Sequence, residues 1–206
     1  MSPVVPGGVT GMILAGGRAR RMGGEDKGLI ELHGRPMVHH ALDALAPQVD
    51  VLLVNANRHL ERYRELAGPY RAEVIHDALE DHQGPLAGIA RGLAACTTEW
   101  LVCVPCDSPL IAHDLVARLV AGQQADGAEI AVAHCERLQP VFALLRRELL
   151  PSLERYLASG ERKIDRWYDR HHLVTVDFSD SPEQFLNVNT PREHAELARR
   201  LAGMNP

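Results

Sequence analysis

The residue types best suited to chemistry lie in one glycine-rich, basic stretch, residues 14–27, with the sequence LAGGRARRMGGEDK. Glycines let a backbone approach phosphate oxygens closely and point its N–H groups at them. The cationic side chains of Arg21 and Lys27 can neutralise the charge that builds on phosphates during a transfer reaction. The alternative, a solvated charged turn, does not account for the glycines around the cations. The stretch therefore predicts a site for a small anionic ligand.

This stretch differs from the two best-known phosphate-binding motifs. The sequence contains no G-x-x-x-x-G-K-[ST] pattern, which disfavours a switch GTPase. It also lacks G-x-G-x-x-G after a strand, which disfavours a dinucleotide-dependent dehydrogenase.

Short apolar runs alternate with amphipathic stretches, a pattern typical of βαβ units and a parallel sheet. Strands are expected at residues 9–14, 49–54, 73–75, 100–104, 130–133, 141–145 and 173–178. Helices are expected at residues 36–45, 60–66, 86–95, 110–121, 149–158, from 162 and from 191. We therefore predict one α/β domain, residues 9–206, with a Rossmann-like, mostly parallel sheet and helices on both faces. The Pro- and Gly-containing residues 1–8 are expected to be a disordered lead-in.

Polar residues follow the strands expected in the first half of the chain. In open parallel sheets, ligands bind beyond the carboxyl ends of the strands. The residues found there are Gly16, Gly17, Arg21, Lys27, Asn55, Asp77 and Asp107. They combine flexible backbone, cations and carboxylates, the groups that a triphosphate with Mg²⁺ requires.

The overall composition restricts the partners. A formal net charge of −5 argues against a nucleic-acid or anionic-membrane partner, since both need a basic face. No apolar run approaches the roughly 20 residues that span a bilayer, and residues 1–8 lack the apolar core of a signal peptide. Four irregularly spaced cysteines are too few for a disulfide framework, so a cytoplasmic location is expected.

Cys103 and Cys106 form an isolated C-x-x-C pair. A redox or metal role would need a lowered thiol pKa or a second pair of ligands. Because Cys103 falls inside an apolar run, we interpret it as a buried strand residue.

The last helix carries the clearest boundary signal. Thr190 is expected as its N-cap, Pro191 as its first residue, and Glu193 as the partner that completes a T-x-x-E capping box.

Six segments, taken together, resemble the molybdenum cofactor guanylyltransferases, a family of the nucleotidyltransferase superfamily that includes the nucleoside-diphosphate-sugar pyrophosphorylases. The first is L-A-G-G-x-x-x-R-M-G-G-x-D-K at residues 14–27. The others are V-N-A-N at 54–57, G-P-L-A-G at 84–88, P-C-D-S-P at 105–109, G-E-R at 160–162 and N-V-N-T-P at 187–191. They occur in the family's order over nearly the whole chain, and they imply the nucleotide-diphospho-sugar transferase type of fold.

The resemblance also implies roles for particular residues. The nucleotide would be lined by Leu14, Ala15 and Gly16, contacted on its phosphates by Lys27, and bound further by Asn55 and Asp77. Asp107 would hold Mg²⁺ and, with Arg21 and Lys27, form the catalytic set.

Simpler interpretations remain for several of these residues. Asn55 and Asp77 are also residue types that cap strand-to-helix turns. The simpler interpretation of Asp107, a turn carboxylate before Ser108 and Pro109, is less favoured than those for Asn55 and Asp77. Asn187 and Asn189 are either loop formers or the counterpart of the late metal ligand in sugar nucleotidyltransferases. We favour a role for these two asparagines near the metal or the acceptor.

The implied reaction is transfer of GMP from GTP to the terminal phosphate of molybdopterin or molybdenum-molybdopterin, releasing pyrophosphate. Other cofactor-biosynthesis proteins and acceptor molybdoenzymes are the implied protein partners. The nearest rival is a CTP-dependent cytidylyltransferase, whose first loop resembles L-A-A-G where this chain has Gly16 and Gly17. The non-enzymatic rival is a nucleotide-binding scaffold that delivers cofactor, against which Lys27 and Asp107 both argue.

Overall fold

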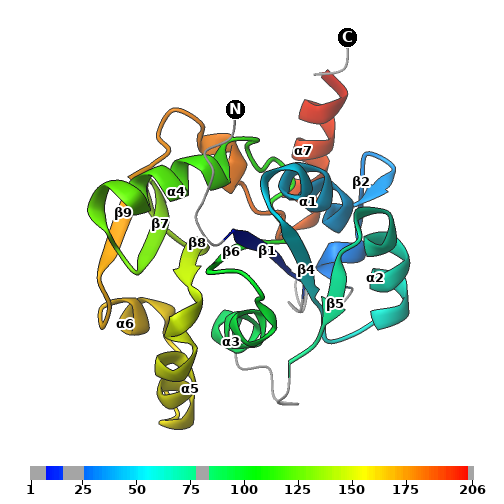
Figure 1. The fold of residues 1–206 in the computed structure, drawn as a ribbon. Helices are drawn as coiled ribbons and strands as arrows, with labels where there is room; N and C mark the ends of the chain where they lie inside the picture. The colour runs from blue at the N-terminus through cyan, green and yellow to red at the C-terminus, as the bar shows by residue number, and fades with distance from the viewer. Residues whose placement is uncertain (1–7, 16–25, 78–83, 204–206) are drawn as a thin grey trace.

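Seven strands form the central sheet of the protein (Figure 1). The computed structural model describes residues 8–15, 26–77 and 84–203, so most of the expected lead-in, Gly16 and Arg21 lie outside the described residues. The strands are β1 (Val9–Leu14), β4 (Val51–Asn55), β5 (Glu73–Ile75), β6 (Trp100–Pro105), β7 (Ile130–Cys135), β8 (Arg137–Arg146) and β9 (Leu173–Asp177). Their order in the sheet is β5-β4-β1-β6-β8-β7-β9.

The sheet is parallel except for β8, which runs antiparallel to both of its neighbours. Strands β5, β4, β1 and β6 are consecutive and parallel, and their last residues are in register: Leu14 pairs with Asn55 on one side and with Pro105 on the other. The mostly parallel sheet predicted from the sequence is confirmed.

Helices cover both faces of the sheet, as expected (Figure 1). The helices are α1 (Met37–Leu45), α2 (Leu60–Ala67), α3 (Pro85–Ala95), α4 (Leu115–Asp126), α5 (Leu150–Ala158), α6 (Ile164–Tyr168) and α7 (Pro191–Gly203). Helices α1, α2 and α4 share one apolar cluster with the sheet, and α3, α5 and α6 share the other. Strand β6 contributes to both clusters, with Val102 on one face and Cys103 on the other, because successive side chains of a strand alternate.

One helix lies elsewhere than the sequence indicates. The apolar pattern predicts a helix at residues 110–121, but α4 begins at Leu115 and ends at Asp126. Residues 110–114 instead connect β6 to α4, and Ile111 is buried there. The end of α4 is set by Gly127, whose left-handed backbone (φ 77°) lets its N–H bond the carbonyl of Gln123 at 2.7 Å.

Two strand features were not expected. A short hairpin, β2 (Glu31–Leu32) and β3 (Arg35–Pro36), lies outside the main sheet, with His33 and Gly34 both at positive φ in its turn. Strand β8 begins four residues earlier than predicted, because its first residues pair with β7 beyond a register shift.

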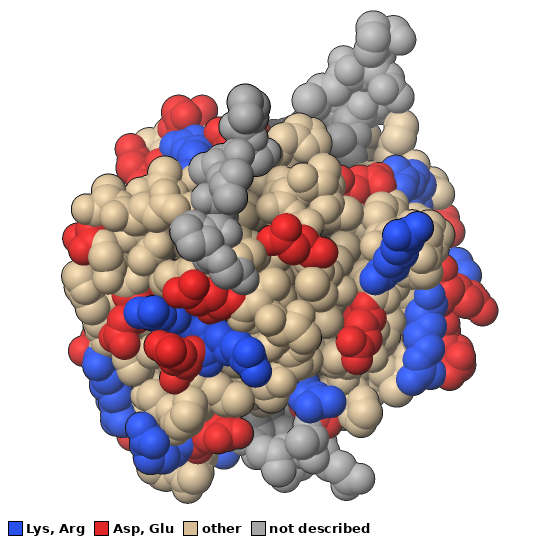
Figure 2. Space-filling model, in the orientation of Figure 1, with Lys and Arg blue, Asp and Glu red and all other residues tan. Residues whose placement is uncertain are grey.

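Basic and acidic side chains are intermixed on the face shown in Figure 2, rather than gathered by sign. The described helices include none with the length and apolar character needed to cross a membrane. All four cysteines are buried free thiols, and burial raises the pKa of Cys103 and of Cys106 well above the ordinary value. The interpretation of the C-x-x-C pair as structural is supported.

Candidate nucleotide site

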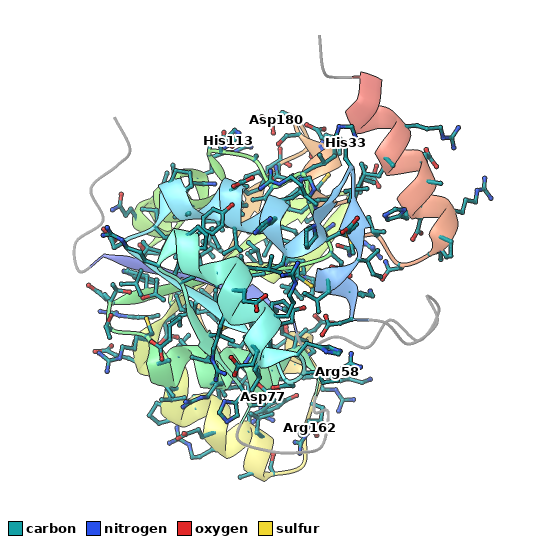
Figure 3. All side chains as sticks on the ribbon, turned by 90° about the vertical axis from the view of Figure 1, so that its right-hand side faces the viewer. His33, Arg58, Asp77, His113, Arg162 and Asp180 are labelled. Carbon is teal, nitrogen blue, oxygen red and sulfur yellow. The ribbon has the colours of Figure 1, made fainter. Side chains whose placement is uncertain are left out.

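The carboxyl ends of β5, β4, β1 and β6 form one edge of the sheet, and the site residues predicted from the sequence gather along it. Ala15 extends β1 at this edge, where its N–H donates to the carbonyl of Asn55 at 2.8 Å. The N–H of Cys106 donates to the carbonyl of Leu14 at 3.1 Å, so the loop after β6 is held against the end of β1. Asp77 and Arg58, labelled in Figure 3, belong to the loops after β5 and β4.

A first group of side chains, the amide cluster, consists of Asn55, Asn57 and Asp77. The amide of Asn55 donates to Asp77 Oδ1 at 2.9 Å, and the amide of Asn57 donates to Asp77 Oδ2 at 2.7 Å. The backbone N–H of Asp77 donates in return to Asn57 Oδ1 at 2.8 Å. Both carboxylate oxygens of Asp77 are therefore held by neutral donors, and Asn57, which was not singled out as a site residue, completes the cluster.

Helix α3 approaches the amide cluster so closely that its fourth residue must be glycine. A Cβ added at Gly88 would lie 2.6 Å from Leu14 Cδ2 and 2.9 Å from Asn55 Oδ1. The G-P-L-A-G segment thus brings the start of a helix against the end of β1 and β4.

A second group, the lysine cluster, consists of Lys27, Asp107 and Asn189. Lys27 Nζ forms an ion pair with Asp107 Oδ2 at 2.8 Å and also donates to Asn189 Oδ1. The side chains of Lys27 and Asp107 are only 17% and 14% exposed, so their attraction is screened less than that of a surface pair. The structure thus places the late N-V-N-T-P segment beside Asp107.

Two further contacts fasten that segment to the loop after β6. The N–H of Val188 donates to the carbonyl of Asp107 at 2.9 Å, and Ser108 Oγ donates to Asn187 Oδ1. Asn187 therefore contacts Ser108, while Asn189 contacts Lys27 directly.

The backbone around Lys27 is held by a buried carboxylate. Asp26 is 6% exposed and caps the short helix that begins at Lys27, since its Oδ1 accepts from Gly28 N–H at 3.2 Å and from the hydroxyl of Tyr63 at 2.5 Å. Burial raises the pKa of Asp26 despite these hydrogen bonds. A Cβ at Gly28 would lie 2.4 Å from the Tyr63 hydroxyl oxygen, so the Tyr63 hydroxyl can reach Asp26 only if residue 28 is glycine. Sequence analysis missed Asp26 and Tyr63, although G-G-x-D-K was a signal for the first.

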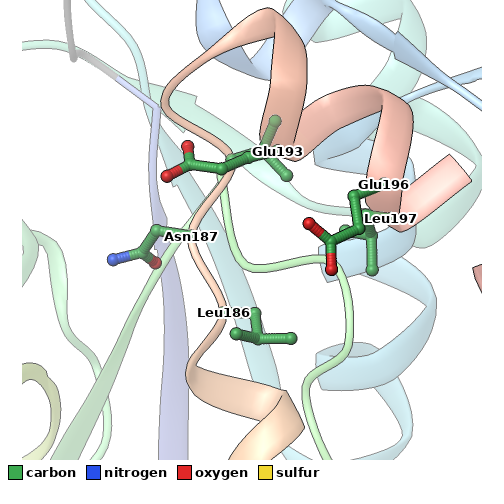
Figure 4. A pocket seen from close by; sticks show the side chains of 6 residues that line it. Leu186, Asn187, Glu193, Glu196 and Leu197 are labelled. Carbon is green, nitrogen blue, oxygen red and sulfur yellow. The ribbon is translucent and has the colours of Figure 1, made fainter.

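The cap of α7 fixes the other side of the lysine cluster. Thr190 Oγ1 accepts from Glu193 N–H at 3.2 Å, as predicted, and Glu193 Oε2 accepts from the N–H of Asn189 at 2.8 Å. The N–H of Asn189 lowers the pKa of Glu193. The backbone N–H of Thr190, the donor expected in the capping box, also lowers the pKa of Glu193. A pocket of about 130 Å³ lies beside this cap, lined by Leu186, Asn187, Val188, Glu193, Glu196 and Leu197 (Figure 4).

The described residues contain no group of three His, Cys, Asp or Glu side chains able to hold a metal ion by themselves. The oxygens of Asp107 and Asn189 nevertheless converge on one cationic group, the ammonium of Lys27. Mg²⁺ is commonly bound by one or two carboxylates together with substrate phosphates and water. This donor set therefore fits Mg²⁺ that arrives with a nucleotide.

Solved structures share this architecture. The molybdopterin-guanine dinucleotide biosynthesis protein A from Archaeoglobus fulgidus superimposes with a TM-score of 0.78 over 95% of this chain and 100% of that chain, at 24% sequence identity. The fold is of the nucleotide-diphospho-sugar transferase type.

Residues 11–174 match the model of the MobA-like NTP transferase domain, and the chain belongs to this family. It is 50% identical to the molybdenum cofactor guanylyltransferase of Vibrio cholerae, over 93% of this chain and 92% of that protein. It is 48% identical to the molybdenum cofactor guanylyltransferase of Shewanella halifaxensis, over 94% of this chain and 96% of that protein.

Proposed function

We propose that this protein transfers GMP from GTP to the terminal phosphate of molybdopterin, with or without bound molybdenum, and releases pyrophosphate. The family and the names of its relatives support guanylyl transfer. The lysine cluster is the structural observation that carries the proposal, because it joins a cation and a carboxylate at the edge where nucleotides bind in such sheets.

In the proposed reaction, a phosphate oxygen of the acceptor attacks the α-phosphorus of GTP in line. The new P–O bond forms as the bond from the α-phosphorus to the bridging oxygen breaks, and pyrophosphate leaves with that electron pair. No general base is required, since a phosphate monoester is already ionised near neutral pH. The protein contributes positioning and neutralisation of charge.

Different residues of the chain are proposed to supply the positioning and the neutralisation of charge. Lys27 neutralises charge on the departing phosphates, and Arg21 is proposed to assist it. Leu14 and Ala15, with Gly16, are proposed to line the nucleotide, while Asn55 and Asp77 hold its base or ribose end. Mg²⁺, held by Asp107 and assisted by Asn189, would supply further charge neutralisation when bound.

The proposed cellular setting is the cytoplasm. Four free thiols support a reducing compartment such as the cytoplasm. Other cofactor-biosynthesis proteins and acceptor molybdoenzymes are the proposed partners, and neither nucleic acid nor a membrane is expected among them.

The decisive experiment offers equal GTP and CTP with saturating pterin acceptor and Mg²⁺, and identifies the dinucleotide by mass spectrometry. A pocket that pairs the edge of guanine leaves polar groups unpaired with cytosine, at about 1–3 kcal/mol for each loss. Two such losses predict an excess of the guanine product of about a hundredfold. Equal incorporation, or an excess of the cytosine product, would contradict the guanylyl assignment. Nucleotide binding without release of pyrophosphate would instead establish the delivery scaffold.

A further inference from the structure

Arg58, in the loop after β4, carries a buried donor without an acceptor. Its Nη2 is inaccessible to solvent and has no hydrogen-bond partner in the described part of the chain. A guanidinium nitrogen removed from water without an acceptor is unfavourable, so such groups are normally paired. The unpaired Nη2 therefore points to an acceptor outside the described residues, and a bound ligand would supply one.

The nearby carboxylate of Asp26 does not fill this role. Burial raises the pKa of Asp26, whereas the hydroxyl of Tyr63 and the charge of Arg58 lower it, so Arg58 is close enough to act on it electrostatically. Yet the hydrogen bonds described at Asp26 come from Tyr63 and Gly28, and no ion pair within 4.0 Å joins it to Arg58 among the described residues.

Arginines close by in the sequence behave differently. Arg62 and Arg64, on α2, are half exposed and pair with Glu65 and Glu61 on the same helix. Those contacts are typical surface ion pairs, which contribute little to stability. Arg58 instead has a buried Nη2 that donates to none of the described residues.

The placement of Arg58 connects the two clusters of the site. It directly follows Asn57 of the amide cluster, and it acts electrostatically on Asp26, which directly precedes Lys27 of the lysine cluster. Figure 3 shows it in the same region of the molecule as Asp77. Arg58 is therefore a candidate contact for a ligand that extends from one cluster to the other.

We propose that Arg58 is a nucleotide-binding residue that donates to the β- or γ-phosphate of the bound nucleotide. This inference rests on the proposed function. A guanidinium presents parallel N–H donors that match phosphate oxygens, and charge-assisted hydrogen bonds of this kind are strong. Arg58 thus complements the point charge of Lys27 with a directional contact.

The test measures binding of GTP, GMP and inorganic pyrophosphate by calorimetry to the wild type and to Arg58→Gln, Arg58→Lys and Arg62→Gln. Arg58→Gln is expected to weaken GTP and pyrophosphate at least about tenfold and GMP by much less. Arg58→Lys should recover part of the lost affinity, since lysine keeps the positive charge but lacks the parallel N–H donors of the guanidinium. Arg62→Gln is the matched control and should bind like the wild type, and thermal unfolding verifies that each variant is folded.

Unchanged GTP binding by Arg58→Gln would overturn the inference. So would an equal loss of affinity for GTP and GMP, which indicates a structural role. A wild-type protein that binds no guanine nucleotide would instead overturn the proposed function itself, so the two failures are distinguishable.

Discussion

The amide cluster and the lysine cluster lie on the same sheet edge but differ in how they are built. In the amide cluster, neutral amides satisfy a carboxylate through hydrogen bonds from two neighbouring strand ends, with Asn55 and Asp77 only 22 positions apart. In the lysine cluster, an ammonium lies between oxygens from segments 80 and 162 positions away. The first arrangement has fixed donor and acceptor geometry, which suits recognition of a base or sugar. The second is held by charge, which a polyphosphate and its metal ion can rearrange.

The largest effect is expected for Asp107→Ala. Loss of the carboxylate removes the proposed metal ligand and should lower kcat at least about 100-fold, by analogy with other electrostatic deletions. Steady-state kinetics at saturating GTP and Mg²⁺ measures this loss. Asp114→Ala, at an exposed position beside α4, is the control and should leave kcat unchanged. If Asp107→Ala kept most of the magnesium-dependent rate, Asp107 would not be the metal ligand, and the proposed difference between the two clusters would be wrong.

Lys27→Ala should show a smaller loss, about 10- to 100-fold in kcat, with less effect on GTP affinity. The reason is that a cation facing the departing pyrophosphate acts mainly in the transition state. Pre-steady-state kinetics and equilibrium GTP binding separate the two quantities, and Lys27→Arg tests whether charge alone suffices. If KM rose with kcat unchanged, Lys27 would be a ground-state phosphate anchor.

Asp77→Ala should produce the opposite pattern. Without the carboxylate, the amides of Asn55 and Asn57 lose their acceptor, and the KM for GTP should rise about tenfold while kcat changes little. Glu73→Gln, exposed on β5, is the matched control. A fall in kcat as large as that of Asp107→Ala would show that the two clusters act as one unit.

The smallest effect concerns the cap beside the lysine cluster. The N–H of Asn189 lowers the pKa of Glu193 below its ordinary value of 4.5, so the charged form stabilises the fold above that pH, and this contribution is lost as pH falls through the lowered value. Because Glu193 is exposed, Glu193→Gln should destabilise by at most about 0.5 kcal/mol at pH 7. Urea unfolding at pH 7 and at pH 3 measures the difference, which should shrink as the pH falls. A difference of the same size at both pH values would mean that the charge is not its source.

Local sequence signals determined much of the site. The structure has Asn55, Asp77 and Asp107 at the strand ends where the sequence predicts them, because strand ends are marked by a change from apolar to polar residues and parallel strands bring those ends to one edge. The start of α7 was equally predictable, since Thr190 and Pro191 act within one turn of the helix. Glu193 additionally accepts from the N–H of Asn189, one residue before the predicted N-cap.

Contacts between distant segments decided the rest. Helix α4 begins at Leu115 rather than at residue 110, and there Gln48 accepts from Val116 N–H at 3.1 Å and donates to the Ala112 carbonyl at 2.9 Å. No pattern within residues 110–121 encodes a cap from 68 positions away. The pairing of Lys27 with Asn189 is of the same kind. The sequence therefore determined which residues end each strand, because that choice depends on neighbouring side chains, whereas only the packed structure decided which of them meet.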